Sequence, residues 1–268
     1  MRDKSKVAVL GHGFLGGEFH NSGYDVLGRI RFSWPCSLDC LDAYDTVVNC
    51  IGIADTRACE EPGNWARVHD ANAALVRALS DYCESKGKRF VHISTGCVYD
   101  RNNSPQREDG FTSSHCRYVV SKLAGEYSCR PGDLILRPRL YFSGVADRNN
   151  LFTKLPRFDR HLNEINSYTS TRTIVEAAGA LIEHGQSGVF NVAQKGYASI
   201  GQLCGFLGIA QKPPVTGDEL QREQGLALVN NILDTTKLER FYEPRDLYEE
   251  VAGCWDELNP SMSVAGLS

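Results

Sequence analysis

The sequence predicts an α/β fold, in which a doubly wound parallel sheet is covered by helices on both faces and is followed by a smaller C-terminal lobe. Short, continuously apolar segments recur through the first half of the chain, as buried parallel strands require. A long amphipathic segment separates two of them, and a glycine-rich turn follows the first. Strands, a glycine turn and a crossover helix in this order are typical of such a sheet.

These patterns place the elements along the chain. The first strand is expected at Lys6–Leu10, and the glycine-rich Gly11–Gly17 leads into a helix at Glu18–Asn21, which Ser22–Gly23 ends. Further strands are expected at 24–28, 46–52, 89–94 and 134–137. Segment 65–86 carries apolar residues at helical spacing and is the expected crossover helix. After residue 142 the pattern loosens, with helix candidates at 149–158 and 171–184 and a strand at 188–193.

The composition describes an ordinary globular chain and excludes several classes of protein. The 268 residues are 42% hydrophobic and 23% charged, which rules out disorder, collagen and a coiled coil. A net charge of −4 leaves no basic excess for binding nucleic acid. No apolar stretch approaches the roughly 18 residues of a membrane span, and we expect no cleaved signal. Ten cysteines form neither a CxxC pair nor a Cys/His cluster, so we expect no metal site, no disulfide framework, and a reducing, cytoplasmic location.

The glycine-rich turn marks the expected cofactor site. Gly11-His12-Gly13-Phe14-Leu15-Gly16 is a G-x-G-x-x-G sequence, where glycines let the backbone approach a pyrophosphate at a helix N-terminus, as in a Rossmann-type domain. Arg29 follows the second strand where NAD-binding chains carry an acid, so NADPH is favoured, with NADH as the alternative. A turn made only for tight packing and a solvated arginine pair are the competing interpretations. We expect 1–142 to bind NADP(H) and 143–268 mainly to bind substrate, with segments that can interleave.

A tyrosine, a lysine and a threonine form the expected catalytic group. Tyr118 and Lys122 are four residues apart on a predicted helix, so the ammonium can lower the pKa of the phenol from about 10 toward neutrality. Thr95 follows the fourth strand, at the edge where such sheets bind ligands, and its hydroxyl can hold a substrate carbonyl. An amphipathic surface pair and a turn cap are the alternatives.

Together these motifs resemble those of the extended short-chain dehydrogenase/reductase family over essentially the whole chain. The matching stretches are Gly11-x-Gly13-x-x-Gly16, Asp45–Gly52, Asn72, Ser94–Tyr99 and Tyr118-x-x-x-Lys122-Leu123-Ala124-Gly125-Glu126. One departure is visible, because the family usually spaces its first two glycines one residue further apart. The resemblance implies cofactor contacts from Gly11, Gly13, Phe14, Leu15, Gly16, Arg29, Asn49, Cys50, Gly52, Tyr118 and Lys122.

Within that family the chain is most similar to enzymes of nucleotide-rhamnose synthesis, and more to the bifunctional 3,5-epimerase/4-reductases than to the monofunctional 4-dehydrorhamnose reductases. Thr95–Asp100 and Asn150–Lys154 carry this similarity. The resemblance puts Cys97 and Lys154 on opposite sides of the sugar ring, where they would exchange the C3 and C5 protons that the C4 ketone acidifies. Which of the two is the base stays open.

The resemblance implies a nucleotide-sugar substrate, either a UDP- or a dTDP-4-keto-6-deoxy-glucose, and NADPH as reductant. Substrate contacts are expected from Thr95, Arg139, Asn150 and Arg172. A homodimer is a further expectation. The alternatives are a plain 4-reductase in which Cys97 and Lys154 are bystanders, another NAD(P)-dependent sugar-nucleotide epimerase or dehydratase, and a non-catalytic dinucleotide-binding regulatory subunit.

Overall fold

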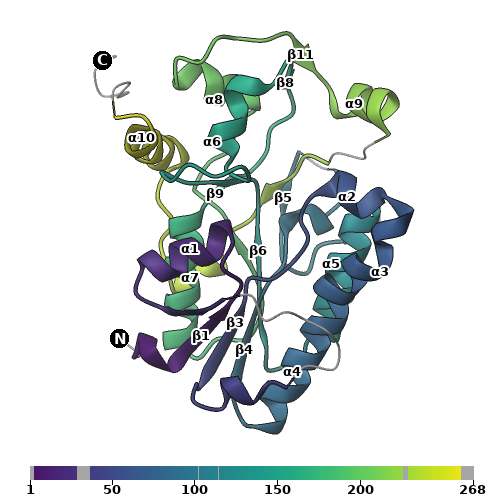
Figure 1. The fold of residues 1–268 in the computed structure, drawn as a ribbon. Coiled ribbons are helices and arrows are strands. Elements are labelled where there is room, and N and C mark those ends of the chain that lie inside the picture. Colours follow the sequence, from purple (N-terminus) through teal and green to yellow (C-terminus); the bar gives the residue numbers. More distant parts are fainter. Residues whose placement is uncertain (1–2, 29–36, 102, 114, 226–228, 261–268) are drawn as a thin grey trace. The chain divides into compact units, whose positions relative to one another are not determined.

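The computed structural model of the chain describes residues 3–28, 37–101, 103–113, 115–225 and 229–260. The chain divides into two compact units, each made of three segments (Figure 1). Unit 1 comprises Met1–Val98, Ser114–Arg137 and Ala178–Phe190; unit 2 comprises Tyr99–Ser113, Pro138–Ala177 and Asn191–Ser268. The units therefore interleave along the chain.

The core of unit 1 is a parallel sheet, which confirms the predicted fold class. Its strand order is β10-β6-β4-β3-β1-β2, and β2, β1, β3, β4 and β6 pair in parallel. The strands are β1 (Val7–Leu10), β2 (Asp25–Leu27), β3 (Thr46–Asn49), β4 (Arg89–Ile93), β6 (Leu134–Pro138) and β10 (Gly188–Val192). The chain passes from β1 to β2 on one side and then to β3 on the other side of β1. The switch point, where open sheets of this kind bind ligands, therefore lies between β1 and β3.

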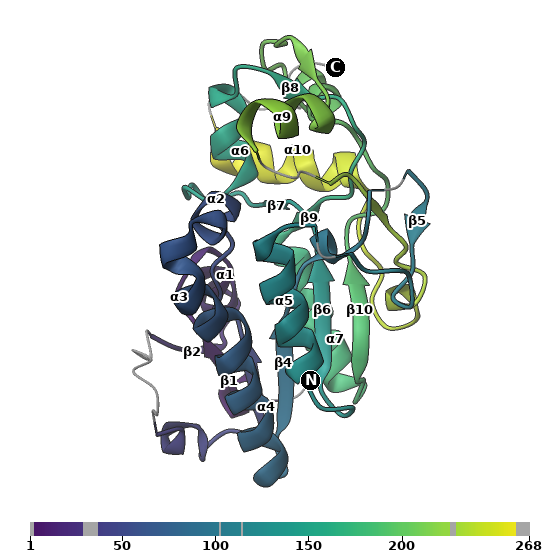
Figure 2. The same cartoon turned by 90° about the vertical axis from the view of Figure 1, so that its right-hand side faces the viewer.

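Helices on both faces explain why the strands are apolar throughout. Unit 1 contains α1 (Phe14–Asn21), α2 (Thr56–Glu60), α3 (Trp65–His69), α4 (Leu75–Ser85) and α5 (Arg117–Ser128). Helices α3, α4 and α5 cover one face of the sheet, and α1 lies on the other (Figure 2). On the first face, Ala8, Val47 and Phe90 share a buried cluster with α4. Two-sided coverage of this kind buries every residue of β1 and β3.

The expected crossover helix at 65–86 is present, but it is not regular. Between α3 and α4 the chain makes one π-helical turn, Asp70–Ala74. Asn72, in the middle of this turn, is fully buried. Single π-turns within α-helices often accompany functional residues, and the contacts of Asn72 described below bear on the site.

Helix α1 begins at Phe14, so the prediction that a helix starts at Glu18 was wrong by four residues. Gly13 is the N-cap, and Gly16 lies within the first turn. A Cβ atom on Gly16 would lie 1.8 Å from the carbonyl oxygen of Gly11, so only glycine lets the helix start this close to the end of β1. The helix ends as predicted, because Ser22 is its C-cap.

Unit 2 has its own core, formed by short elements. Strand β5 (Pro105–Gln106) pairs with β12 (Ile232–Leu233), β7 (Tyr141–Phe142) with β9 (Thr169–Ser170), and β8 (His161–Leu162) with β11 (Pro214–Val215). The helices are α6 (Leu151–Lys154), α7 (Thr171–Glu183, shared with unit 1), α8 (Ile200–Phe206), α9 (Gly217–Gln224) and α10 (Leu247–Leu258). Phe142, Phe152, Tyr168 and Trp255 fill the core. The helix expected at 149–158 is α6 followed by a 3-10 turn at Leu155–Arg157.

The described residues contain no helix with both the length and the apolar composition needed to cross a membrane. The nine cysteines in these ranges are free thiols, and Cys36 lies outside them.

Candidate active site

Thr95, Tyr118 and Lys122 all lie in unit 1, where β4 ends and α5 begins. Tyr118 is the second residue of α5, and Thr95 follows β4 by two residues. The Lys122 ammonium reaches back to the strand and donates a hydrogen bond to the carbonyl oxygen of Ile93 (2.8 Å). The 3-10 turn after Thr95, Gly96–Val98, packs against α5. The structure therefore brings the helix that carries Tyr118 and Lys122 against the strand end that carries Thr95.

The Thr95 side chain has a local structural role. Its Oγ1 accepts a hydrogen bond from the Cys97 backbone N–H (3.1 Å), so it caps the 3-10 turn. A hydroxyl that accepts one hydrogen bond still carries a proton that it can donate. The turn-cap interpretation and the carbonyl-binding interpretation are therefore compatible. Cys97 is half-buried on the same turn.

Burial lowers the pKa of Lys122 from its usual 10.5 to about 8, and the Glu126 carboxylate opposes this shift. Desolvation disfavours the charged ammonium, whereas a neighbouring negative charge favours it. A lysine with a pKa of about 8 still carries its proton at pH 7 in most molecules. It can therefore act as the cation that the predicted chemistry requires beside Tyr118.

The loop after β3 carries Cys50 and Gly52 and is held by two buried asparagines. Asn49 accepts a hydrogen bond from the Ile51 N–H through its side-chain oxygen (3.0 Å). Asn72 bonds the backbone of Ile53 twice: its Oδ1 accepts from the N–H (2.7 Å) and its Nδ2 donates to the carbonyl oxygen (2.9 Å). The Lys122 Nζ atom lies 3.8 Å from the place where a Gly52 Cβ would stand. The loop after β3 and the lysine of α5 are thus neighbours.

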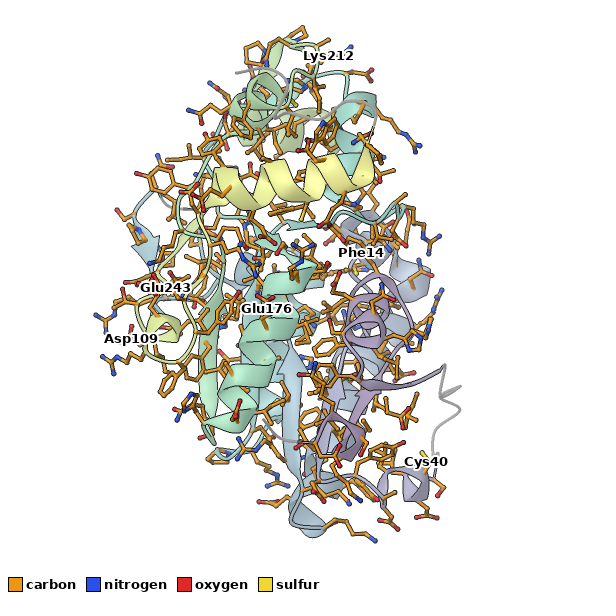
Figure 3. The ribbon with its side chains drawn as sticks, turned by 90° about the vertical axis from the view of Figure 1, so that its left-hand side faces the viewer. Phe14, Cys40, Asp109, Glu176, Lys212 and Glu243 are labelled. Carbon is orange, nitrogen blue, oxygen red and sulfur yellow. The ribbon has the colours of Figure 1, made fainter. Side chains whose placement is uncertain are left out.

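The glycine turn lies after β1, next to this loop. A Cβ atom on Gly11 would lie 2.9 Å from the Ile51 side chain, and Gly11 has a φ of +102°. By contrast, nothing lies within 4 Å of a Cβ atom on Gly13, so space is open at the start of α1. Phe14 opens the helix (Figure 3), and Leu15 is buried. Arg29, on which the preference for NADPH rests, lies outside the described residues.

The sequence interpretation missed a buried ion pair behind this site. The Arg137 guanidinium donates to Glu126 from Nε to Oε1 (2.9 Å) and from Nη2 to Oε2 (2.5 Å). The Ser94 hydroxyl donates to the same carboxylate (2.5 Å). Glu126 lies one helical turn after Lys122, and this spacing was the available signal.

Glu60 was missed as well. Its Oε1 accepts a hydrogen bond from the backbone N–H of Arg117 (2.7 Å), the first residue of α5. The guanidinium of Arg117 in turn lies over the Trp65 ring, 5.9 Å from its centroid. Helix α2 therefore fixes the end of α5 at which Tyr118 lies. Nothing in the spacing of Glu60 predicted this contact.

The remaining predicted residues belong to unit 2. Lys154 is the exposed last residue of α6. Arg139 is buried and donates to the Asn166 side chain (2.6 Å). Arg172 forms an ion pair with Glu257, in which Nη2 donates to both carboxylate oxygens (2.7 and 2.8 Å). The structure thus pairs both arginines within the protein.

Asn150 caps α6, and its amide is fully used by the protein. The side-chain oxygen accepts from Phe152 N–H (3.0 Å) and Ser143 N–H (3.3 Å), and the nitrogen donates to the carbonyl oxygens of Ser143 and Val145 (both 2.8 Å). The residue is fully buried. Its contact with substrate stays a prediction, and the geometry indicates a capping role.

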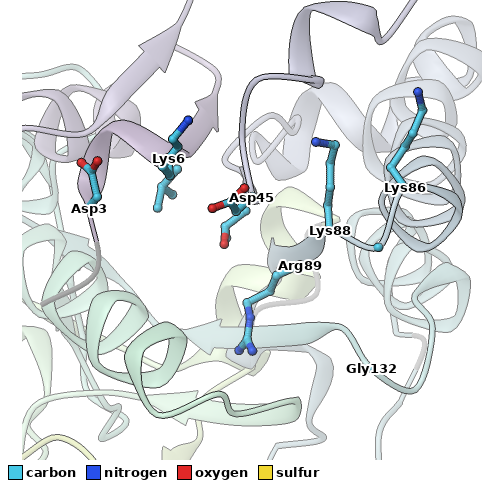
Figure 4. Close-up of a pocket in the computed structure, with 10 residues that line it drawn as sticks. Asp3, Lys6, Asp45, Lys86, Lys88, Arg89 and Gly132 are labelled. Atoms are coloured by element: carbon cyan, nitrogen blue, oxygen red, sulfur yellow. The ribbon is translucent and has the colours of Figure 1, made fainter.

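A hollow of about 590 Å³ lies at the amino ends of β1, β3 and β4, opposite the strand ends that bear the predicted site (Figure 4). Lys6, Lys88, Arg89, Asp3 and Asp45 line it with charges of both signs. None of its lining residues belongs to the predicted site, which lies at the carboxyl ends of these strands.

Comparison with known proteins gives sequence matches and a match of the fold. The model of the NAD dependent epimerase/dehydratase family matches residues 37–131. A dTDP-4-dehydrorhamnose reductase of Mycobacterium tuberculosis is 28% identical over 197 residues, which are 66% of this chain and 64% of the relative. The bifunctional dTDP-4-dehydrorhamnose 3,5-epimerase/reductase of Arabidopsis thaliana is 22% identical over 65% of each chain. The matched stretches therefore span somewhat less than two thirds of these relatives.

A solved structure shows the same fold at nearly full length. The L780 UDP-rhamnose synthase of Acanthamoeba polyphaga mimivirus superposes with a TM-score of 0.80 at 16% identity, over 94% of this chain and 99% of that one. This likeness establishes the fold alone. Together with the family model, the curated relatives and the arrangement of Thr95, Tyr118 and Lys122, it shows that the chain is similar to NAD dependent epimerases/dehydratases and to dTDP-4-dehydrorhamnose reductases.

Proposed function

We propose that the chain is an NADPH-dependent reductase of nucleotide-bound 4-keto-6-deoxy sugars, and that it also epimerises C3 and C5 before it reduces C4. The observation that carries the proposal is the hydrogen bond from Lys122 to Ile93, because it brings the Tyr118/Lys122 helix to the strand end that bears Thr95. The relatives of known name support the reductase step, and one of them the epimerase step.

The glycine turn fits a dinucleotide. The first amides of α1 and the open space above Gly13 suit a pyrophosphate, while Gly16 lets the helix start next to β1. Gly11, Phe14 and Leu15 complete the turn, and Asn49, Cys50 and Gly52 form the neighbouring loop. Arg29 would hold a 2′-phosphate and so select NADPH. NADPH, when bound, supplies the hydride that goes to C4 of the sugar.

In the reduction, Thr95 and Tyr118 act on the C4 oxygen, and Lys122 supports Tyr118. Thr95 donates a hydrogen bond to the carbonyl, which favours the negative charge that develops on the oxygen. Tyr118 delivers the proton to that oxygen. Lys122 holds the ribose of the dinucleotide and, as a cation, lowers the pKa of the tyrosine.

In the epimerisation, Cys97 and Lys154 exchange the protons of C3 and C5. Both carbons flank the C4 ketone, so loss of either proton gives an enolate stabilised by the same carbonyl that Thr95 holds. Inversion needs one group on each face of the ring. We assign one of these roles to Cys97, which lies two residues after Thr95 in the chain, and the other to Lys154. Unit 2 would also hold the UDP or dTDP part, with Arg139 and Arg172 as candidates and Asn150 through its cap of α6.

A proton NMR time course in deuterated buffer tests both steps. Purified protein, NADPH and UDP- or dTDP-4-keto-6-deoxy-glucose should give an L-rhamnose nucleotide that carries deuterium at C3 and C5. Tyr118→Phe should abolish reduction but keep deuterium exchange. Cys97→Ser and Lys154→Met should lose exchange but keep reduction of the already epimerised keto-sugar.

The same experiment separates the alternatives. Reduction without deuterium at C3 and C5 would show a plain 4-reductase. Tightly held NAD after purification, with no net reduction, would indicate a 4-epimerase or dehydratase. If the protein binds the dinucleotide but converts neither keto-sugar, it would be a non-catalytic regulatory subunit.

A homodimer is part of the proposal. Tyr127 is 78% exposed on α5, and Val120 is exposed two turns before it. Sedimentation velocity of the wild-type protein and of Tyr127→Glu would test whether copies associate through this face. The wild type should sediment as a dimer and Tyr127→Glu as a monomer. If both sediment as monomers, the proposed homodimer is contradicted.

A further inference from the structure

We propose that Glu126 is a positioning residue of the active site: it holds α5 to the end of β4 through Ser94, and its carboxylate, paired with Arg137, places a negative charge one helical turn from Lys122. This inference rests on the proposed reductase function, in which Lys122 acts as a cation. It adds Glu126, Ser94 and Arg137 to the residues that determine activity.

The contacts form a clamp between one helix and one strand end. Lys122 and Glu126 lie one turn apart on the same face of α5. Lys122 donates to the carbonyl oxygen of Ile93, and Glu126 accepts from the hydroxyl of the next residue, Ser94. Thr95 follows directly. Two successive residues of the strand end are therefore held by two successive turns of the helix, and this fixes where the Thr95 hydroxyl lies relative to the helix of Tyr118.

Burial makes this clamp costly to disturb. The Glu126 and Arg137 side chains are each 6% exposed, and three hydrogen bonds of 2.9, 3.2 and 2.5 Å join them. A buried ion pair of this kind is strongly destabilising when only one partner is removed, because an uncompensated charge remains. The pair is therefore not a loose surface contact that could adopt several geometries.

Few other charged groups lie near enough to Lys122 to affect its pKa. The titratable groups around the ammonium are Glu126 and Cys129 on α5, Cys50 after β3, Cys59 on α2 and His92 on β4, and the Arg137 guanidinium of β6 is paired with Glu126. Desolvation raises the pKa of all three thiols and lowers that of His92 well below its usual value. These four groups are therefore neutral near pH 7. The Glu126 carboxylate is the charge among them that opposes the desolvation of Lys122.

Loss of that carboxylate should therefore affect the chemistry in a specific way. With its pKa at about 8, Lys122 is protonated at pH 7. The Glu126 carboxylate, one helical turn away, is the first of the charges that raise this pKa, and a nearby opposite charge shifts a pKa by roughly one unit or more. Without it, the ammonium would lose its proton near neutral pH, and the phenolate of Tyr118 would lose the cation that stabilises it.

The first test needs no turnover, so it can fail independently of the proposed function. The pKa of Lys122 is read from the 13Cε resonance in lysine-labelled apoprotein, assigned by its loss in Lys122→Arg. Glu126→Gln should lower this pKa by about one unit or more. Glu84→Gln, which removes an exposed carboxylate from α4, is the control and should leave it unchanged.

A second variant guards against misfolding. Glu126→Gln/Arg137→Gln removes both charges, so no uncompensated guanidinium is left, and it should lower the pKa of Lys122 by less than Glu126→Gln does, because loss of the guanidinium acts in the opposite direction. Circular dichroism confirms that each variant is folded. A folded Glu126→Gln variant with the parental Lys122 pKa would overturn the inference, even if the parent proves to be an active reductase.

The second test reads catalysis. In Glu126→Gln the alkaline limb of kcat against pH should move down by about one unit, and Glu126→Asp should restore much of it. A purely structural role would lower kcat at every pH without moving the limb, and that result would overturn the positioning role. If the parent reduces no keto-sugar, the proposed function fails, while the resonance of Lys122 still decides the role of Glu126.

Discussion

Replacing Asn72 with alanine should destabilise unit 1 by more than the loss of one hydrogen bond, because the side chain makes several. Asn72 makes three hydrogen bonds in the π-turn: two with the backbone of Ile53 and one to the Ser121 hydroxyl (2.9 Å). It is fully buried, so water cannot replace these partners. At roughly 1 kcal/mol for each bond, with the added cost of leaving the Ile53 groups unsatisfied, we expect a loss of about 3 kcal/mol.

Urea unfolding of the apoprotein, followed by circular dichroism, measures this loss. A change of this size is a large fraction of the 5–15 kcal/mol typical of a domain. The matched control is Asn64→Ala, because Asn64 makes one hydrogen bond, to the Ala58 carbonyl oxygen (3.0 Å), from a partly buried position. It should cost about 1 kcal/mol. Equal losses in the two variants would refute the reasoning that Asn72 holds the loop after β3.

Four further predictions concern the cofactor site and the catalytic helix. Gly16→Ala should weaken NADPH binding, measured by fluorescence titration, because its Cβ would lie 1.8 Å from a backbone oxygen; Gly17→Ala, with nothing within 4 Å, should bind normally and stabilise α1 by about 0.5–1 kcal/mol. Because burial lowers the pKa of Lys122 to about 8, kcat should fall as the pH rises through about 8, and a profile flat to pH 10 would contradict this. In the unfolded chain Lys122 keeps its proton up to about pH 10.5. Between pH 8 and pH 10.5 the unfolded state therefore binds more protons, so Lys122 should make the free energy of unfolding, measured by urea titration, rise with pH. Glu60→Ala should cost about 1 kcal/mol and lower kcat by loosening the start of α5, whereas the exposed neighbour Glu61→Ala should change neither stability nor turnover; equal effects would contradict the capping role.

The fold could be predicted where local patterns reflect burial. Continuous apolar runs located the parallel strands, because helices on both faces leave no polar side. The same reasoning misplaced the start of α1. Gly16 and Gly17 are poor helix formers, so they were assigned to a turn, but tertiary packing requires Gly16 inside the helix. Helix propensity cannot show which backbone groups a glycine allows to come into contact.

The site could be predicted only as far as spacing along one element reaches. Tyr118 and Lys122 share a helix, so their proximity follows from sequence. Arg172, in contrast, pairs with a residue 85 positions away, and Glu60 caps a helix 57 positions away. Such partners come together only through the fold. The sequence alone does not predict which carboxylate an arginine or lysine side chain pairs with.

The interleaving of the two units has a consequence for how the chain can be cut. The chain leaves unit 1 at Tyr99, returns at Ser114, leaves again after Arg137 and comes back only at Ala178. A fragment that stopped soon after β6 would lack β10, its neighbour in the sheet, and would expose an apolar strand edge. Exposed edges of that kind pair with other chains. We therefore expect limited proteolysis to release no stable N-terminal half, and N-terminal expression fragments to aggregate.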